Sequence, residues 1–156
     1  MDLSAYRPNV GVVLINKDGR VWLGRRVGTS GPHNWQFPQG GVDSGEDFEA
    51  AAKRELQEET GVSSVKLLAR TDGWIHYAFP EGHGGSKQAK GWLGQKQIWF
   101  AYRFTGDESE IDLVAHAPQE FDAWRWAPID EAIDEVVAFK RDAYRQVIEA
   151  FKPLAA

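Results

Sequence analysis

The stretch GGVDSGEDFEAAAKRELQEETGV, from Gly40 to Val62, carries the strongest structural signals in the chain. Asp43, followed three residues later by Glu46, resembles a capping box at a helix start. Residues 46–60 contain no glycine or proline and are rich in helix-forming residues, and Gly61 suits the position that ends a helix. We therefore predict a helix over 46–60, with a glycine-containing loop before it.

This helix concentrates negative charge on one side. Glu55, Glu58 and Glu59 fall within an arc of about 100° on a helical wheel. A solvated acidic face is one interpretation, but such faces usually place Lys or Arg four residues after Glu. Here Glu55 is followed by Glu59, and Glu58 by Val62. Clustered carboxylates without cationic partners suit a hard divalent cation, so we predict a Mg²⁺ or Mn²⁺ site.

The spacing also carries a family resemblance. The pattern G-x5-E-x7-R-E-U-x-E-E-x-G-U, where U is aliphatic, is the Nudix box, and the stretch from Gly40 to Val62 matches all nine specified positions. A chance match in a chain of this length is on the order of 10⁻⁷. The chain therefore resembles the Nudix hydrolases, in which the box forms a loop–helix–loop that binds Mg²⁺ or Mn²⁺. In that family, water attacks a phosphorus of a nucleoside diphosphate linked to another group.

The resemblance assigns roles to the box residues. It implies that Glu55, Glu58 and Glu59 are metal ligands and catalytic residues, one of them also a candidate base. It places Gly40 at the metal site and in the loop, Gly61 at the helix end, and Glu46 and Arg54 in a structural pair. Glu120, before FDAWRW, would complete the metal site or act as general base; a surface carboxylate is the alternative.

Further stretches resemble one Nudix branch, the bacterial RNA 5′-pyrophosphohydrolases and the similar asymmetric dinucleoside tetraphosphate hydrolases. They are YRPNVG (6–11), WQFPQGG (35–41), GQKQIWF (94–100), EFDAWRW (120–126) and FKRDAYRQV (139–147). The resemblance covers about residues 6–151 and weakens only over 81–93, a segment that borders the expected substrate cleft.

Several residues outside the box are candidates for substrate binding. Arg7 and Arg26 lie at strand ends, where solvated arginines are common, but guanidinium groups also bind phosphate oxygens bidentately. The branch places the position of Arg7 on the substrate's phosphates and that of Phe139 against a nucleobase; a core role is the alternative for Phe139. Further candidates are Gln95 and Lys96 for phosphates, Lys140 at the last helix, and Tyr77 for base stacking or packing.

The remaining sequence predicts a mixed order of strands and helices, which indicates an α+β fold or an α/β/α sandwich with a mixed sheet. We expect strands at 9–16, 20–26, around 35–40, 65–71, 74–79, 97–104 and 123–126, a last helix at 136–151, and a mobile loop at 79–94. One domain over residues 1–156 is expected from the length and the absence of a linker.

Composition limits the function classes. No apolar run reaches about 18 residues, no signal peptide is visible, and no cysteine is present, so we expect a cytoplasmic protein without a membrane span. A net charge of −5 argues against binding to duplex DNA. The four histidines show no metal-ligand spacing.

The predicted function is a metal-dependent pyrophosphohydrolase. It would remove pyrophosphate from the 5′ end of triphosphorylated RNA, or hydrolyse dinucleoside polyphosphates such as diadenosine tetraphosphate to ATP and AMP. ADP-ribose or nucleoside triphosphates as substrates, and a catalytically silent nucleotide sensor, are the alternatives. A sensor usually loses box glutamates, and here all of them are present.

Overall fold

The computed structural model describes residues 2–29 and 31–155, and its strands form a single mixed sheet. The strand order is β3-β2-β1-β7-β5, with β4 paired to β1, β6 to β7, and β8 to β2. The strands are β1 (Tyr6–Ile15), β2 (Val21–Arg26), β3 (Trp35–Gln36), β4 (Gln39–Gly41), β5 (Val65–Arg70), β6 (Ile75–Ala78), β7 (Gly94–Phe104) and β8 (Phe121–Ala127).

The centre of the sheet is the parallel pair β1–β7, and the other paired strands run antiparallel. The β-branched run in β1 is buried on both faces, as expected for a central strand. The strand begins at Tyr6 rather than at the predicted Asn9. This extension brings Arg7 onto the sheet, opposite Gln95 of β7.

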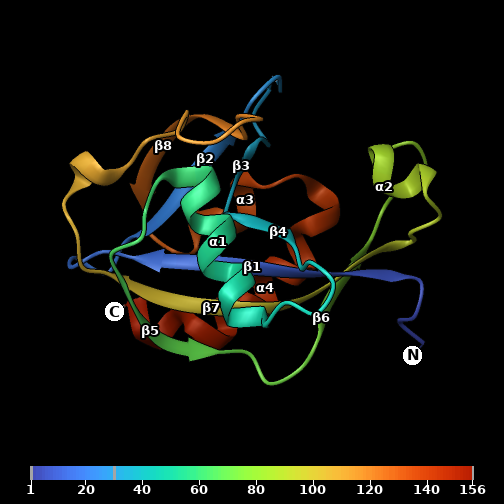
Figure 1. Ribbon diagram of the computed structural model, residues 1–156, viewed down its shortest axis with the longest axis horizontal. Coiled ribbons are helices and arrows are strands. Elements are labelled where there is room, and N and C mark those ends of the chain that lie inside the picture. Colours follow the sequence, from blue (N-terminus) through green and yellow to red (C-terminus); the bar gives the residue numbers. More distant parts are fainter. Residues whose placement is uncertain (1, 30, 156) are drawn as a thin grey trace.

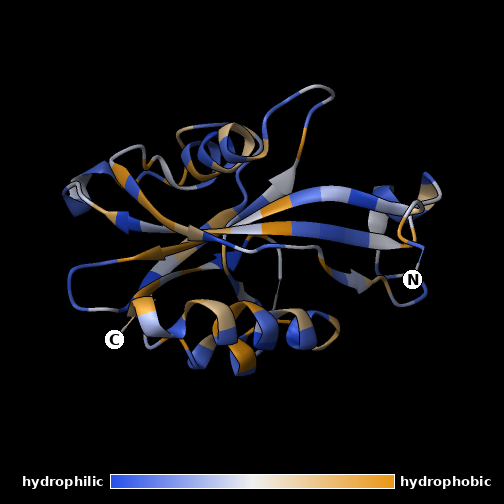
Figure 2. Cartoon of the chain, turned by 90° about the horizontal axis from the view of Figure 1, so that it is seen from below, coloured by the Kyte–Doolittle hydropathy of each residue, from blue (hydrophilic) through white to orange (hydrophobic). Residues whose placement is uncertain are grey.

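Helices cover both faces of the sheet (Figures 1 and 2). Alternate residues of β1 separate two hydrophobic clusters: Val10, Val12 and Leu14 pack with α1 (Phe48–Thr60), whereas Val13 and Ile15 pack with α4 (Arg141–Phe151). The predicted α/β/α arrangement with a mixed sheet is confirmed. Among the described residues, no helix combines the length and apolar character needed to span a bilayer.

Helix α1 begins two residues later than predicted. Asp47 is its N-cap, and its carboxylate accepts a hydrogen bond from the Ala50 N–H at 3.1 Å. Glu46 lies in the preceding turn, where its carboxylate accepts from the Asp43 N–H at 3.0 Å. The end of the helix was predicted correctly, because Gly61 adopts φ 80° and donates to the Gln57 carbonyl.

The predicted helix over 136–151 is wrong in residues 136–140. Residues 136–140 contain two extended residues and a 3₁₀ turn (Ala138–Lys140), and α4 begins at Arg141; a separate short helix, α3 (Glu131–Glu135), ends just before this segment. Val136 and Val137 have extended ψ values of 154° and 141°, consistent with the low helix propensity of β-branched residues.

Several further segments differ from the prediction. The expected loop over 79–94 contains a short helix, α2 (Gly85–Ala89), and 3₁₀ turns also occur at Glu108–Glu110 and Lys152–Ala155. Strand β8 runs beyond the predicted 123–126 at both ends.

Candidate active site

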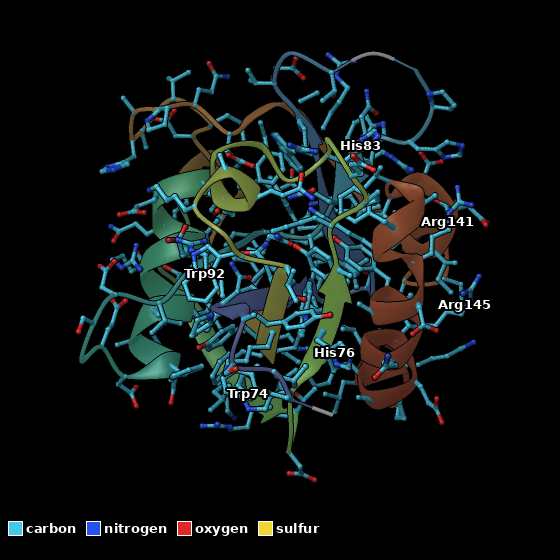
Figure 3. All side chains as sticks on the ribbon, turned by 90° about the vertical axis from the view of Figure 1, so that its right-hand side faces the viewer. Trp74, His76, His83, Trp92, Arg141 and Arg145 are labelled. Atoms are coloured by element: carbon cyan, nitrogen blue, oxygen red, sulfur yellow. The ribbon has the colours of Figure 1, made fainter. Side chains whose placement is uncertain are left out.

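A cleft of about 460 Å³ opens at the end of the sheet that carries the start of β1 and of β7. Figure 3 looks at this end of the molecule, with α1 and α4 on its two sides and the α2 segment nearest the viewer. The lining residues come from most elements of the fold: Arg7, Asn9, Arg26, Gln36, Gln39, Gly40, Gly41, Glu55, Glu59, Tyr77, Phe79, His83, Gly84, Gly85, Lys87, Gln95, Glu120, Phe139 and Lys140.

Two glycines of β4 allow side chains from other elements to enter this cleft. A Cβ atom on Gly40 would collide with the Glu55 carboxyl group, and a Cβ on Gly41 would collide with the Arg7 guanidinium. Because β4 carries no side chain at these two positions, Glu55 of α1 and Arg7 of β1 pass close to its backbone and reach the cleft.

Three carboxylates line the cleft: Glu55 and Glu59 belong to α1, and Glu120 immediately precedes β8. Burial, together with the charges of Glu120 and Glu55, raises the pKa of Glu59 well above its ordinary value. Burial also raises the pKa of Glu55, although Arg54 opposes this shift. The only hydrogen bond to Glu59 from the described backbone is the Gln39 N–H, at 3.3 Å. Glu59 thus lies among like charges with little compensation.

Arg54 organises the turn before α1. It donates to Glu46 at 2.8 and 2.9 Å and to the Gly41 carbonyl at 2.9 Å. The hydrogen bond from Arg54 lowers the pKa of Glu46 to about 2. These contacts connect the turn before α1 to the middle of the helix.

Glu58 is the box glutamate that this structure does not bring into the cleft. Its carboxylate lies 3.2 Å from Arg54 Nη1 and 3.7 Å from His116 Nε2. Arg54 Nη1 is also 2.8 Å from Glu55, so one guanidinium nitrogen holds two of the expected metal ligands.

The donor chemistry of the cleft fits a hard divalent cation. Glu55, Glu59 and Glu120 supply carboxylate oxygens to one space, and the repulsion that raises the pKa of Glu59 would be relieved by a cation. In their present rotamers, however, no three His, Cys, Asp or Glu side chains in the described part of the chain surround a common point. A bound ion would therefore require rotation of these side chains, which the hydrogen bond from Arg54 to Glu55 now restrains.

Cationic groups line the same cleft: Arg7, Arg26, Lys87 and Lys140. Arg7 Nη1 donates to Gln95 Oε1 at 3.3 Å, and Lys140 Nζ donates to Gln36 Oε1 at 3.1 Å. Burial, and secondarily the charge of Arg26, lowers the pKa of Lys140 to about 7. Within one cleft, the carboxylates can therefore bind a metal cation, and the cationic side chains beside them can bind an anion.

Side-chain amides form a hydrogen-bond network beside these cationic residues, which we call the cationic wall. Gln95 accepts from Asn9 Nδ2 at 2.8 Å and donates to the Tyr77 hydroxyl, which also accepts from Gln39 Nε2 at 3.1 Å. Tyr77 is buried, so its ring serves packing more than open stacking. Phe139 is half-buried against the core and also lines the cleft, with its ring centroid 5.8 Å from that of Tyr77.

Lys96 lies outside the cleft. Side chains alternate along β7, so Gln95 points into the cleft and Lys96 to the face that carries α1. There Lys96 Nζ lies 4.9 Å from the ring centroid of Trp74. The structure does not support the predicted phosphate contact by Lys96.

Sequence reasoning missed Lys87, Gln36, Gln39 and His83 as lining residues. Gln36 and Gln39 stand within the quoted WQFPQGG stretch, but they lie on two different short strands, β3 and β4, so no single alternation pattern identified both. Lys87 and His83 belong to the segment in which the resemblance is weakest, so no motif marked them.

Comparisons with known proteins agree with this architecture. The family model described as "NUDIX domain" matches residues 5–149. The chain is 62% identical to a protein named RNA pyrophosphohydrolase from Caulobacter vibrioides, over 99% of this chain and 91% of that protein. It is 50% identical to a protein of the same name from Rhizobium meliloti, over 96% and 95% of the two chains.

Solved structures share the fold at lower identity. The Escherichia coli dihydroneopterin triphosphate pyrophosphohydrolase aligns with a TM-score of 0.70 at 21% identity, covering 93% of this chain and 98% of that one. An Ap4A hydrolase from C. elegans aligns with a TM-score of 0.65 at 21% identity, covering 94% and 98%. With the family model spanning most of its length and relatives at this identity, the chain belongs to the Nudix family.

Proposed function

We propose that this protein is a metal-dependent pyrophosphohydrolase that acts on the 5′ end of triphosphorylated RNA. The observation that carries the proposal is the cleft in which three carboxylates face the cations Arg7, Arg26 and Lys140. Relatives at 46–62% identity that are named RNA pyrophosphohydrolase support the same substrate.

The chemistry follows from the groups in the cleft. Arg7, Arg26 and Lys140 bind non-bridging phosphate oxygens, and Phe139 contacts the first base. The oxygen of a water molecule attacks phosphorus, and a P–O bond of the phosphoanhydride breaks. Pyrophosphate is released, and the RNA keeps a single phosphate at its 5′ end. A carboxylate oxygen of Glu55, Glu59 or Glu120 accepts the proton from the water.

Glu55, Glu59 and Glu120 would hold the divalent cation, with Glu58 joining them after release from Arg54. When bound, Mg²⁺ or Mn²⁺ neutralises phosphate charge and activates water. Gly40 contributes by leaving space for Glu55.

Dinucleoside polyphosphates are the second candidate substrate. Diadenosine tetraphosphate also presents a 5′-polyphosphate on a nucleoside, so the same cationic wall and Phe139 would bind it. Hydrolysis would then give ATP and AMP. The RNA substrate is favoured because the full-length relatives carry that name. It also agrees with the expected cytoplasmic location, since RNA is turned over there.

The test is a side-by-side assay in Mg²⁺ and in Mn²⁺, with a short 5′-triphosphorylated RNA and diadenosine tetraphosphate as substrates. We expect kcat/KM to be at least tenfold higher for RNA, with pyrophosphate and 5′-monophosphorylated RNA as products. A tenfold preference for diadenosine tetraphosphate would establish the second candidate instead. No product from these two substrates, from ADP-ribose or from nucleoside triphosphates, together with metal-dependent binding, would identify a sensor.

A further inference from the structure

The segment between β6 and β7 brings a charged residue into the cleft that no motif identified. It runs from Phe79 to Leu93, contains α2, and stands at the open end of the sheet (Figures 1 and 3). Its contributions to the cleft wall are Phe79, His83, Gly84, Gly85 and Lys87.

Hydrogen bonds hold this segment in place. The Phe79 N–H donates to the Leu93 carbonyl at 2.8 Å, and the Leu93 N–H donates to the Ala5 carbonyl at 2.9 Å, two residues before Arg7. Within the segment, Gln88 accepts from the Gly84 N–H at 3.1 Å and donates to the Pro80 carbonyl at 3.2 Å. The position of Lys87 is therefore tied to the start of β1 and so to Arg7.

The Lys87 ammonium group has no anionic partner in the described part of the chain. Neither a hydrogen bond nor an ion pair is formed by its Nζ with the described residues, although its side chain is partly buried and lines the cleft. Burial, followed by the charge of Arg7, lowers its pKa, and the charges of Glu120 and Glu55 oppose this shift only in part. A partly buried ammonium beside a guanidinium is unfavourable until an anion occupies the space between them.

We propose that Lys87 is a phosphate-binding residue, which together with Arg7 grips the 5′-polyphosphate chain of the substrate. This inference rests on the proposed function and adds a binding residue to it. The two cations come from different elements, so a phosphate chain between them contacts both the sheet and the α2 segment. The α2 segment thereby takes part directly in substrate recognition.

Lys90 provides a matched control. It lies three residues further along the same segment, is exposed, and does not line the cleft. The variants to compare are Lys87→Gln, Lys87→Arg and Lys90→Gln. The probe is an ATP analogue with methylene groups in place of both bridging oxygens of the triphosphate, and its Kd is measured by calorimetry in Mg²⁺.

We expect Lys87→Gln to raise the Kd about tenfold, since it removes one charge-assisted contact. Lys87→Arg should stay within about threefold of the parent, and Lys90→Gln within about twofold. Thermal melts of all variants would show that they fold alike. An unchanged Kd for Lys87→Gln, or an equal loss in Lys90→Gln, overturns the inference, as does a parent protein that does not bind the analogue.

Kinetics separate this inference from the proposed function. If the parent binds the analogue and Lys87→Gln weakens it, but neither RNA nor diadenosine tetraphosphate is cleaved, the proposed function fails and the phosphate-binding role stands. If the parent cleaves RNA and Lys87→Gln has the parent's Kd and kcat/KM, the function stands and the role of Lys87 is refuted.

Discussion

Among single residues, the glycines of β4 have the clearest effect on the site. Gly40 and Gly41 occupy positions at which any Cβ would overlap the Glu55 carboxyl group or the Arg7 guanidinium. The absence of a side chain is therefore what lets a carboxylate and a cation reach the same cleft. Backbone conformation is not the reason, since neither glycine has a positive φ.

Gly40→Ala should lower kcat by at least tenfold, because the added methyl group displaces the Glu55 carboxylate. The free energy of unfolding should change by only about 1 kcal/mol. Gly73→Ala is the control, since a Cβ at Gly73 meets open space. Steady-state kinetics and denaturant titration of the two variants measure these effects. Full activity in Gly40→Ala would show that the position of Glu55 does not matter.

Glu59 illustrates a conflict between stability and function. Burial and the charges of Glu120 and Glu55 raise its pKa above the ordinary 4.5. A carboxyl group with a raised pKa stabilises the fold while protonated, which holds below pH 4.5, and loses this stabilisation as the pH rises through the folded-state pKa. Without a metal ion, Glu59 therefore contributes less to the stability of the fold at neutral pH than it does below pH 4.5.

Glu59→Gln should raise the Tm by a few degrees in EDTA at pH 7, because the amide is neutral at every pH. The difference from the parent should shrink as the pH falls and vanish below about 4.5. In Mg²⁺, the same variant should lose at least about 100-fold in kcat. Calorimetry across pH and a kinetic assay measure both effects. A lower Tm for the variant in EDTA at pH 7 would contradict this account of Glu59.

Among the elements, α1 depends on a turn that precedes it. Arg54, in the middle of the helix, reaches back to Glu46 and to the Gly41 carbonyl. This arrangement connects the helix to β4, the strand whose glycines admit Glu55. The hydrogen bond from Arg54 keeps the pKa of Glu46 near 2, so this carboxylate is ionised in the folded protein well below pH 4.5.

Glu46→Gln should lower the Tm at pH 6–7. The depressed pKa of Glu46 contributes stability that is fully present above the unfolded-state pKa near 4.5 and is lost as the pH falls toward 2. The Tm difference between the parent and Glu46→Gln should accordingly shrink over that interval. Glu49→Gln is the control, since within residues 2–29 and 31–155 Glu49 forms an ion pair only with Lys53, at 3.6 Å. Equal pH profiles for the two variants would contradict the role of the Arg54 pair.

The sequence predicted elements where local chemistry determines the structure. The end of α1 follows from Gly61, and the central strand from its β-branched run. The features that the sequence did not predict depend on tertiary contacts. The break before α4 places Lys140 in the cleft, with its ammonium on Gln36, a residue 104 positions earlier. The position of Lys87 depends on the hydrogen bond from Leu93 of its segment to the Ala5 carbonyl, which no local pattern reveals.

For the whole molecule, charge is distributed unevenly. The net charge is −5, yet Arg7, Arg26, Lys87 and Lys140 converge on one cleft. A polyphosphate meets these cations, whereas RNA that extends beyond the cleft meets a chain with an excess of carboxylates. Extended contacts between the RNA backbone and the protein surface are therefore not expected to contribute to affinity.

RNA length should consequently have little effect on catalysis once the first nucleotides are bound. We expect kcat/KM to agree within about threefold for 5′-triphosphorylated RNAs of 3 and 20 nucleotides, because the cleft binds only the polyphosphate and the adjoining nucleoside. Both substrates should also show a similar dependence of kcat/KM on salt, since the same few phosphates are bound in each case. Steady-state kinetics at 50 and 200 mM salt measure both quantities. A 20-nucleotide RNA that is more than tenfold better, with a steeper salt dependence, would instead require a second RNA-binding surface outside the cleft.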